Sequence, residues 1–164
     1  MSKMKTADEI TALLKNEFGE DKFDMNSGDI GSPWITVETT IIKEVSKFLR
    51  DDSSLLFNTL MCLSGVHYSK EEELGVTYHL HSTQLGHTIA LKVRVPEENP
   101  HVPSVEAIWK TANWHEREAW DMVGLKFDNH PNHKRILCPD DWEGHPLRKD
   151  YVQQEFYQGI PTGE

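Results

Sequence analysis

Cysteine is nearly absent from this sequence, because only Cys62 and Cys138 occur among its 164 residues. The two are far apart and form no Cys-x-x-Cys pair, so this chain alone cannot build a four-thiolate iron–sulfur cluster or a zinc ribbon. Isolated cysteines are typical of a reducing compartment, although one disulfide between them stays an alternative. Cys62 lies in an apolar run, so we expect a packed thiol and not a nucleophile.

Long apolar runs and positive charge are also scarce. No stretch of 18 apolar residues occurs, so no segment is predicted to span a bilayer. The polar start Met1–Lys5 shows no secretory signal. With 17 Lys and Arg against 27 Asp and Glu, the net charge is −10. Such a surface repels phosphate backbones and anionic lipid headgroups, so we expect no nucleic-acid partner, and membrane association only through a partner protein.

Motifs that bind cofactors or build active sites are missing, since no Gly-x-Gly-x-x-Gly, P-loop, His-Glu-x-x-His or Gly-x-Ser-x-Gly pattern occurs. We therefore expect no catalytic, cofactor-binding or metal-ligating residue in this chain. A zinc site is one alternative, because four potential ligands lie close in sequence: His130, His133, Cys138 and His145. Their spacing matches no standard zinc motif, so this alternative is not favoured.

Hydrophobic periodicity predicts regular elements in the first part of the chain. Thr6 and Glu9 form a capping box that opens a first helix, and Gly19 ends it. Further predicted elements are a polar connection over 24–32, a strand over 34–38, an amphipathic helix over 41–49, and an apolar run over 55–63 that fits either a buried strand or a helical turn.

Two runs with period two, 76–80 and 89–95, surround a glycine-containing turn. This pattern predicts a β-hairpin with one face in water. Three histidines fall on that face or in the turn and are predicted to be exposed: His79, His81 and His87.

A long helix is predicted from Ser104 to Val123, with Gly124 as its stop. Its core-facing stripe is apolar except for Glu116, and a buried carboxylate is costly unless it is paired. The predicted partners are cations of the C-terminal segment: Arg135, Arg148 or Lys149. A proton-relay role for Glu116 and a contact with another subunit stay as alternatives.

Prolines punctuate the rest of the chain, which has no sustained period and is predicted to be extended. The predicted fold class is α+β, with helices packed on one face of a small, mostly antiparallel sheet. We divide the chain into a core domain over 1–125 and an extended tail over 126–164. The tail is rich in Trp, Tyr and Arg, which dominate protein interfaces, so we expect its distal part to lie across a partner protein. A tail packed wholly on its own core is the alternative.

One long motif is specific. The stretch WKTANWHEREAWDMVG, from Trp109 to Gly124, resembles the signature helix of the C subunit (30-kilodalton-type subunit) of proton-translocating NADH:quinone oxidoreductase, respiratory complex I. The signature residues in this chain are Glu116, Arg117, Glu118, Asp121, His130, Lys134 and Arg135. The stretch DDWEGHPLRKDY over 140–151 resembles the tail of that family. The resemblance implies a partner interface at Trp142, His145, Pro146, Leu147, Arg148, Lys149 and Tyr151.

The resemblance implies a scaffold subunit in the peripheral arm of that complex, which transfers electrons from NADH to quinone coupled to proton translocation. Such a subunit is non-catalytic and carries no redox centre, and FMN and iron–sulfur clusters are expected in partner subunits. The expected neighbours are other peripheral-arm subunits, especially the quinone-cavity (D-type) subunit. We expect a stand-alone subunit, not a C–D fusion, on the cytoplasmic side of the cell inner membrane. The alternative is the equivalent subunit of a ferredoxin-dependent photosynthetic-type complex or a membrane-bound hydrogenase.

Overall fold

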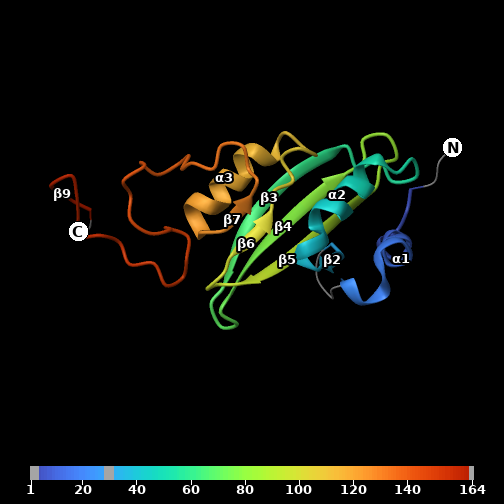
Figure 1. The fold of residues 1–164 in the computed structure, drawn as a ribbon, viewed down its shortest axis with the longest axis horizontal. Helices are drawn as coiled ribbons and strands as arrows, with labels where there is room; N and C mark the ends of the chain where they lie inside the picture. Colours follow the sequence, from blue (N-terminus) through green and yellow to red (C-terminus); the bar gives the residue numbers. More distant parts are fainter. Residues whose placement is uncertain (1–3, 28–31, 163–164) are drawn as a thin grey trace.

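A five-stranded sheet forms the centre of the computed structural model, which describes residues 4–27 and 32–162 (Figure 1). The strands follow the order β1-β2-β5-β4-β3, and all neighbours run antiparallel except β2 and β5. The mostly antiparallel α+β architecture predicted from the sequence is confirmed. The strand bounds are β1 Phe23–Asn26, β2 Trp34–Val37, β3 Thr59–Tyr68, β4 Glu73–His81 and β5 Thr88–Pro96.

Three α-helices lie among the described residues. Their apolar side chains pack against those of the inward face of the sheet, and together they form one hydrophobic core. The capping box is confirmed, since Thr6 N–H donates to Glu9 Oε2 at 2.8 Å and Glu9 N–H donates to Thr6 Oγ1 at 3.3 Å. Within the described ranges, none of the helices has the length and apolar character needed to cross a bilayer. The helical bounds are α1 Ala7–Phe18, α2 Ile42–Asp51 and α3 Ala112–Val123, with short 3-10 turns η1 Glu20–Lys22 and η2 Thr39–Ile41.

Helix α3 is shorter than predicted, because it begins at Ala112 and not near Ser104. Residues 105–111 form turns instead. The Ser104 hydroxyl and the Val105 N–H both donate to the Glu116 carboxylate. The Ser104 hydroxyl also accepts the Glu106 N–H, and a single turn closes where the Trp109 N–H donates to the Val105 carbonyl oxygen, but the regular helix begins only at Ala112.

The predicted β-hairpin is confirmed as β4 and β5, which pair along their whole length. His79 is exposed as predicted, and His81 is half-buried. The prediction for His87 is wrong, because this residue is only 1% exposed. Its Nε2 lies 2.6 Å from the Leu55 carbonyl oxygen, and its ring packs 4.8 Å from the ring of Phe57.

The prediction for Cys62 is also wrong, because its thiol is exposed and not packed. It projects from the solvent side of β3, where Sγ lies 3.3 Å from Ser64 Oγ. Both cysteines are free, and the ambiguous run over 55–63 ends in a strand. The predicted polar connection over 24–32 contributes its first residues to β1. Its residues 28–31, like Met1–Lys3, lie outside the described ranges.

The chain beyond α3 first adds β7 (Lys126–Asp128), which pairs in parallel with β6 (His101–Pro103). Residues 129–155 then contain no helix or strand, and a small hairpin of β8 (Phe156–Tyr157) and β9 (Ile160–Pro161) follows. Figure 1 shows this segment beyond α3, at the end of the molecule opposite α1. The proposed division at residue 125 falls between α3 and β7 and stays a prediction.

Candidate functional site at helix α3 and the tail

Glu116, on the core side of α3, is fully buried. Its Oε2 accepts a hydrogen bond from the Ser104 hydroxyl at 2.6 Å, and its Oε1 accepts one from the Val105 N–H at 2.8 Å. Both partners precede the helix, so the carboxylate closes the turn that leads into α3. The prediction that a tail cation pairs with Glu116 is therefore wrong for all three candidates: Arg135, Arg148 and Lys149.

Burial raises the pKa of Glu116 to about 7, although the two hydrogen bonds act in the opposite direction. The cause is that removal from water penalises the ionised carboxylate. His130 Nε2 lies 3.8 Å from Oε2 and also contacts the Asn113 carbonyl oxygen at 3.0 Å. The buried Tyr78 hydroxyl has no hydrogen-bond partner among the described residues, and burial raises its pKa, with a further contribution from Glu116. Glu116 is thus a buried group that titrates near neutral pH.

Asp121 on the same helix is the carboxylate that binds the tail. Its side chain is fully buried, and one oxygen, Oδ2, accepts three consecutive backbone N–H groups, from Ile136 at 3.0 Å, Leu137 at 2.7 Å and Cys138 at 2.9 Å. The other oxygen, Oδ1, lies 2.6 Å from Arg135 Nη1. Burial alone would raise the pKa of Asp121, but these hydrogen bonds lower it below its usual range.

Two arginines complete this junction from opposite sides. The guanidinium of Arg135, in the tail, donates to the carbonyl oxygens of Trp142 at 2.8 Å and Gly144 at 3.0 Å as well as to Asp121. The guanidinium of Arg117, on α3, donates to the carbonyl oxygens of Lys134 and Arg135, both at 3.0 Å. A guanidinium offers several donors in one plane, so each arginine fixes the path of irregular backbone that has no ladder of its own.

The signature residues thus divide into two groups. Buried or half-buried side chains of the first group hold the chain together: Glu116, Arg117, Asp121, His130 and Arg135. Glu118 and Lys134 form the second group, and their side chains are exposed. Exposed positions in a motif contribute little to the fold, so these two are the better candidates for contacts outside the chain.

The next tail segment lies against the end of α3. His145 Nδ1 lies 3.0 Å from the Asp121 carbonyl oxygen, and the Leu147 N–H donates to the Met122 carbonyl oxygen at 2.8 Å. Gly124 ends the helix with φ at 95°, and a Cβ there would lie 2.9 Å from the His145 ring. Two independent reasons therefore favour glycine at this position: its positive φ, and the lack of space for a Cβ beside the His145 ring.

The predicted partner-interface residues also make contacts within the chain. Trp142 Nε1 donates to the Tyr151 hydroxyl at 3.1 Å, and the Trp142 ring packs 5.2 Å from that of Tyr157. Pro146 is half-buried. Large apolar side chains nevertheless face solvent along the distal tail: Leu147 at 64% exposure, Val152 at 86%, Phe156 at 60% and Ile160 at 68%. Such a series of exposed apolar side chains is typical of a surface that another protein covers.

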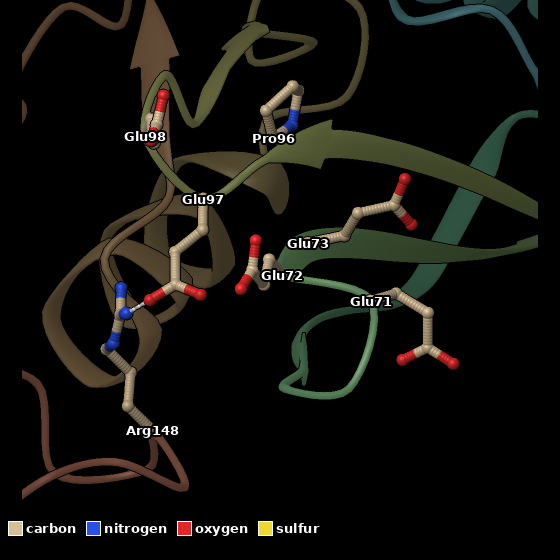
Figure 2. Close-up of a pocket in the computed structure, with 7 residues that line it drawn as sticks. All are labelled: Glu71, Glu72, Glu73, Pro96, Glu97, Glu98 and Arg148. Atoms are coloured by element: carbon tan, nitrogen blue, oxygen red, sulfur yellow. Dashed lines mark ion pairs between the residues drawn. The ribbon is translucent and has the colours of Figure 1, made fainter.

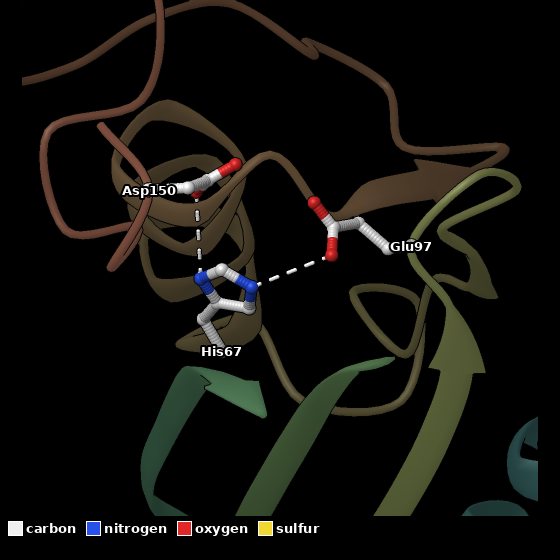
Figure 3. Close-up of side chains that lie close together, drawn as sticks. All are labelled: His67, Glu97 and Asp150. Atoms are coloured by element: carbon white, nitrogen blue, oxygen red, sulfur yellow. Dashed lines mark ion pairs between the residues drawn. The ribbon is translucent and has the colours of Figure 1, made fainter. Parts of the chain in front are cut away.

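A buried histidine at the end of β3 binds the tail a second time. The His67 side chain is only 2% exposed, and its Nδ1 accepts the Lys149 N–H at 2.9 Å. Glu97 Oε2 lies 3.4 Å from Nε2 and Asp150 Oδ1 lies 3.6 Å from Nδ1, so the two carboxylates flank opposite sides of the ring (Figure 3). Arg148 forms ion pairs with both Glu97 and Asp150.

Among the described residues, His67, Glu97 and Asp150 are the one group of three potential metal ligands that lie close together. Their arrangement does not suit a cation. Because Nδ1 accepts a backbone N–H, the proton of a neutral ring sits on Nε2, which leaves no free lone pair there. Arg148 already forms an ion pair with each carboxylate and occupies the position of a cation between them. We interpret the group as a clasp for the tail.

An acidic pocket adjoins this clasp. It has a volume of about 740 Å³ and lies between the β3–β4 and β5–β6 turns (Figure 2). Arg148 forms an ion pair with Glu97 at this pocket, as Figure 2 shows. Most of the residues that line it carry a carboxylate. The lining residues are Glu71, Glu72, Glu73, Pro96, Glu97, Glu98 and Arg148.

The alternative zinc site is not assembled by the described residues. His130 and His133 lie near each other, with ring centroids 5.8 Å apart, but both nitrogens of His130 and Nε2 of His133 are engaged with backbone groups. His145 is engaged with the end of α3, as described above. Burial raises the pKa of the Cys138 thiol, which opposes formation of the thiolate that zinc requires.

Three participants in the site were not predicted from the sequence: Ser104 as a ligand of Glu116, and His67 with Glu97 as the clasp. Ser104 was interpreted as a helix cap, and no pattern in the sequence relates His67 to residues of the tail. The contact of His67 with Lys149 joins residues 82 positions apart, and such proximity is set by the sheet and not by local spacing.

Comparisons with known proteins agree on one family. The family described as "Respiratory-chain NADH dehydrogenase, 30 Kd subunit" matches residues 35–157. The C subunit of NADH-quinone oxidoreductase from Chlorobium phaeobacteroides is 46% identical over 149 residues, which cover 90% of this chain and 90% of that protein. A protein of the same name from Chloroherpeton thalassium is 45% identical over 150 residues, which cover 90% of this chain and 62% of that protein.

Solved structures show the same fold. A trypsin-resistant fragment of Nqo5 superposes with a TM-score of 0.63 at 26% identity, covering 75% of this chain and 98% of the fragment. A chain of the membrane-bound sulfane sulfur reductase, an archaeal respiratory membrane complex, superposes with a TM-score of 0.74 over 90% of this chain and 86% of that chain. At 22% identity, this second likeness shows the fold alone.

Proposed function

The chain belongs to the family of the 30-kilodalton subunit of respiratory-chain NADH dehydrogenase, and from this premise we propose its role. It is a scaffold subunit in the peripheral arm of NADH:quinone oxidoreductase, complex I. The assembled enzyme transfers electrons from NADH to quinone and couples this transfer to proton translocation. The observation that carries the proposal is the family match, which includes both α3 and most of the tail.

The geometry supports a scaffold role. Asp121, Arg117 and Arg135 use their hydrogen-bonding capacity on the backbone of the tail, and Glu116 uses its own on the turn before α3. These groups therefore hold the protein together and are not free to bind a small substrate. We propose that this chain carries no redox centre, and its two separate cysteines support that view. FMN and iron–sulfur clusters then belong to partner subunits.

The distal tail is the proposed docking segment. The chain fixes the tail at two points, Asp121 and His67, and beyond the second point Val152, Phe156 and Ile160 are exposed. A segment that is held at its base loses less entropy when it binds, so less of the contact energy is offset by ordering it. We propose that residues 147–160 lie along the D-type subunit that helps form the quinone cavity. The membrane contact of this chain is then indirect, on the cytoplasmic side of the inner membrane.

The test is a pull-down of the tagged chain from detergent-solubilised membranes, scored by mass spectrometry and by NADH:quinone activity. Recovery of a large complex with that activity is expected. Recovery of the chain alone, free of membrane proteins, would overturn the proposal. A complex that oxidises ferredoxin or hydrogen and not NADH would establish the alternative assembly instead.

Variants of the tail sharpen this test. Val152→Asp with Phe156→Asp places two charges in the proposed docking segment and is expected to abolish recovery of the complex, because charge is costly in a buried apolar interface. Met4→Asp is the matched control, since Met4 is 61% exposed and belongs to the opposite end of the chain. Equal recovery with both variants would exclude the distal tail as the docking segment.

A further inference from the structure

The face of the central sheet that lies opposite the core carries an unusual set of side chains. Inward and outward positions alternate along β3, β4 and β5. The buried row comprises Leu63, Tyr78 and Leu91, which are paired in register. The following row therefore projects from the other face, and it comprises Ser64, Thr77 and Lys92.

Two cations on β5 cover two aromatic rings on this face. Lys92 Nζ lies 3.6 Å from the centroid of the Trp34 ring, on β2. The Arg94 guanidinium carbon lies 4.0 Å from the centroid of the Tyr68 ring, at the end of β3. Gly75 makes room for the second pair, because a Cβ there would lie 2.8 Å from the Tyr68 ring.

The two cations differ in their anionic partners. Arg94 has one within the chain, since its Nη1 lies 3.1 Å from Glu73 Oε2. No carboxylate among the described residues lies within ion-pair distance of Lys92. Burial lowers the pKa of Lys92, and the charge of Arg94 adds to this effect. An ammonium that is partly removed from water and lacks an anion is unfavourable by itself, and an external carboxylate would relieve this cost.

We propose that the cation–aromatic face, defined by Trp34, Tyr68, Lys92 and Arg94, docks a carboxylate-bearing segment of a neighbouring protein subunit. This inference rests on the proposed function, because it requires a multisubunit assembly. Charge selects the occupant: Arg94 already has Glu73 as its partner, so the positive charge of this face that is left to pair is that of Lys92, and a carboxylate complements it. Trp, Tyr and Arg are also the residue types most enriched among binding hot spots.

Other occupants fit less well. A second copy of the chain that used the same face would bring a second Lys92 and no free carboxylate partner from an Arg94–Glu73 pair, and two lysines repel each other. Nucleic acid needs many phosphate contacts, whereas this face offers two cations on an acidic chain. Both are outcomes that the experiment below distinguishes.

Cys62 is a natural reporter of this face. It pairs in register with His79, which pairs with Ala90, which pairs with Trp34, so its exposed thiol projects from the same side. In the intact purified complex, alkylation of Cys62 by a maleimide is expected to be slowed about tenfold or more relative to the isolated full-length chain, because thiol reactivity follows exposure. A photoreactive crosslinker attached at Cys62 is expected to capture an Asp- and Glu-containing peptide of another subunit.

Substitution tests the charge directly. Lys92→Glu is expected to lower the fraction of the chain retained in the complex after a salt wash by about tenfold, because the new carboxylate repels the docked one. Lys92→Met keeps the aliphatic contact with Trp34 and is expected to give a smaller loss. Lys43→Glu is the matched control on exposed helix α2 surface and is expected to leave retention unchanged. Unchanged circular dichroism and Tm of the isolated variants show that the fold persists.

The outcomes separate this inference from the proposed function. If the wild-type chain is recovered with the complex but Cys62 reacts equally in both states, the docking face is wrong and the proposed function stands. Crosslinks to a second copy of this chain or to nucleic acid would likewise overturn the inference. If no complex is recovered at all, the proposed function fails first.

Discussion

Replacement of Asp121 by Asn is expected to release the first part of the tail from α3. The carboxylate has two distinct tasks, since Oδ2 accepts three backbone N–H groups while Oδ1 faces the Arg135 guanidinium at 2.6 Å. Asparagine has one acceptor oxygen and one amide nitrogen. Whichever way it is oriented, its NH₂ group meets donors, either those of the backbone or those of Arg135.

The magnitude follows from these contacts. Hydrogen bonds to a charged group contribute about 1.5–3 kcal/mol each, and loss of one partner of a buried ion pair costs about 3–5 kcal/mol. If the asparagine oxygen keeps the backbone groups, the charge and the Arg135 contact are still lost. We therefore expect the free energy that holds residues 136–138 on the helix to fall by about 3 kcal/mol.

Amide hydrogen exchange measures this loss locally. The N–H groups of Ile136, Leu137 and Cys138 are expected to exchange about 100-fold faster in the variant, as a 3 kcal/mol change implies. The amides of the β4–β5 hairpin should keep their protection, which separates release of the tail from unfolding of the domain. Glu118→Gln is the matched control, because it makes the same chemical change at an exposed position of the same helix.

The reasoning would be refuted by retained protection of these three amides in Asp121→Asn. That result would mean that the path of residues 136–138 is fixed by other contacts, such as those of Arg117 with the carbonyl oxygens of Lys134 and Arg135. Equal acceleration in the hairpin would also refute it, because the carboxylate would then stabilise the whole fold and not the junction.

Three further perturbations have defined outcomes. The pKa of Glu116 is about 7 in the folded state, above its ordinary value of 4.5, so the native state binds a proton more tightly than the unfolded state does. The free energy of unfolding is therefore expected to fall by about 3 kcal/mol as the pH rises from about 4.5 to 7. Urea titrations at several pH values measure this fall, and Glu116→Gln is expected to flatten it. His67→Leu leaves the Lys149 N–H without its acceptor and is expected to increase tryptic cleavage after Arg148 and Lys149, whereas His79→Leu, an exposed control on β4, should not. Gly124→Ala is expected to lower the free energy of unfolding by about 1–2 kcal/mol because of the positive φ, and further because the new Cβ displaces His145. Gly86→Ala is the control, since Gly86 has a positive φ but open space around it, so thermal unfolding of this variant measures the backbone contribution alone.

Local rules predicted much of the fold. The capping box at Thr6, the alternation along β4 and β5, and the amphipathic α2 depend on neighbouring residues, so they can be read without knowledge of the rest. Strand β1 and the parallel pair of β6 and β7 were not predicted, because short strands are specified by partners elsewhere in the chain. The start of α3 was also misplaced, because Ser104 and Val105 bind the buried Glu116 carboxylate, a contact that helical periodicity does not report.

The candidate site was predicted as a set of residues but not as a set of contacts. The motif contains Glu116, Asp121 and Arg135, and the predicted ion pair joined Arg135 to the wrong carboxylate. Helical periodicity placed Glu116 in the core, because its side of α3 packs on the sheet. Asp121 lies outside that stripe and is buried by the tail. The hydrophobic periodicity of α3 cannot predict this burial, because it depends on where a later segment of the chain packs.

The buried Asp121 carboxylate explains why so irregular a tail keeps a defined path. Asp121 supplies an acceptor to three consecutive N–H groups that belong to no helix or strand, and its charge makes each bond stronger than a neutral one. The arginine that neutralises it donates to two carbonyl oxygens further along the tail, so the same ion pair also fixes the approach to His145. Folding then leaves a short distal segment with exposed apolar side chains and a fixed base. A partner that binds this segment orders few additional residues, which is how a small subunit can contribute to the affinity of a large assembly.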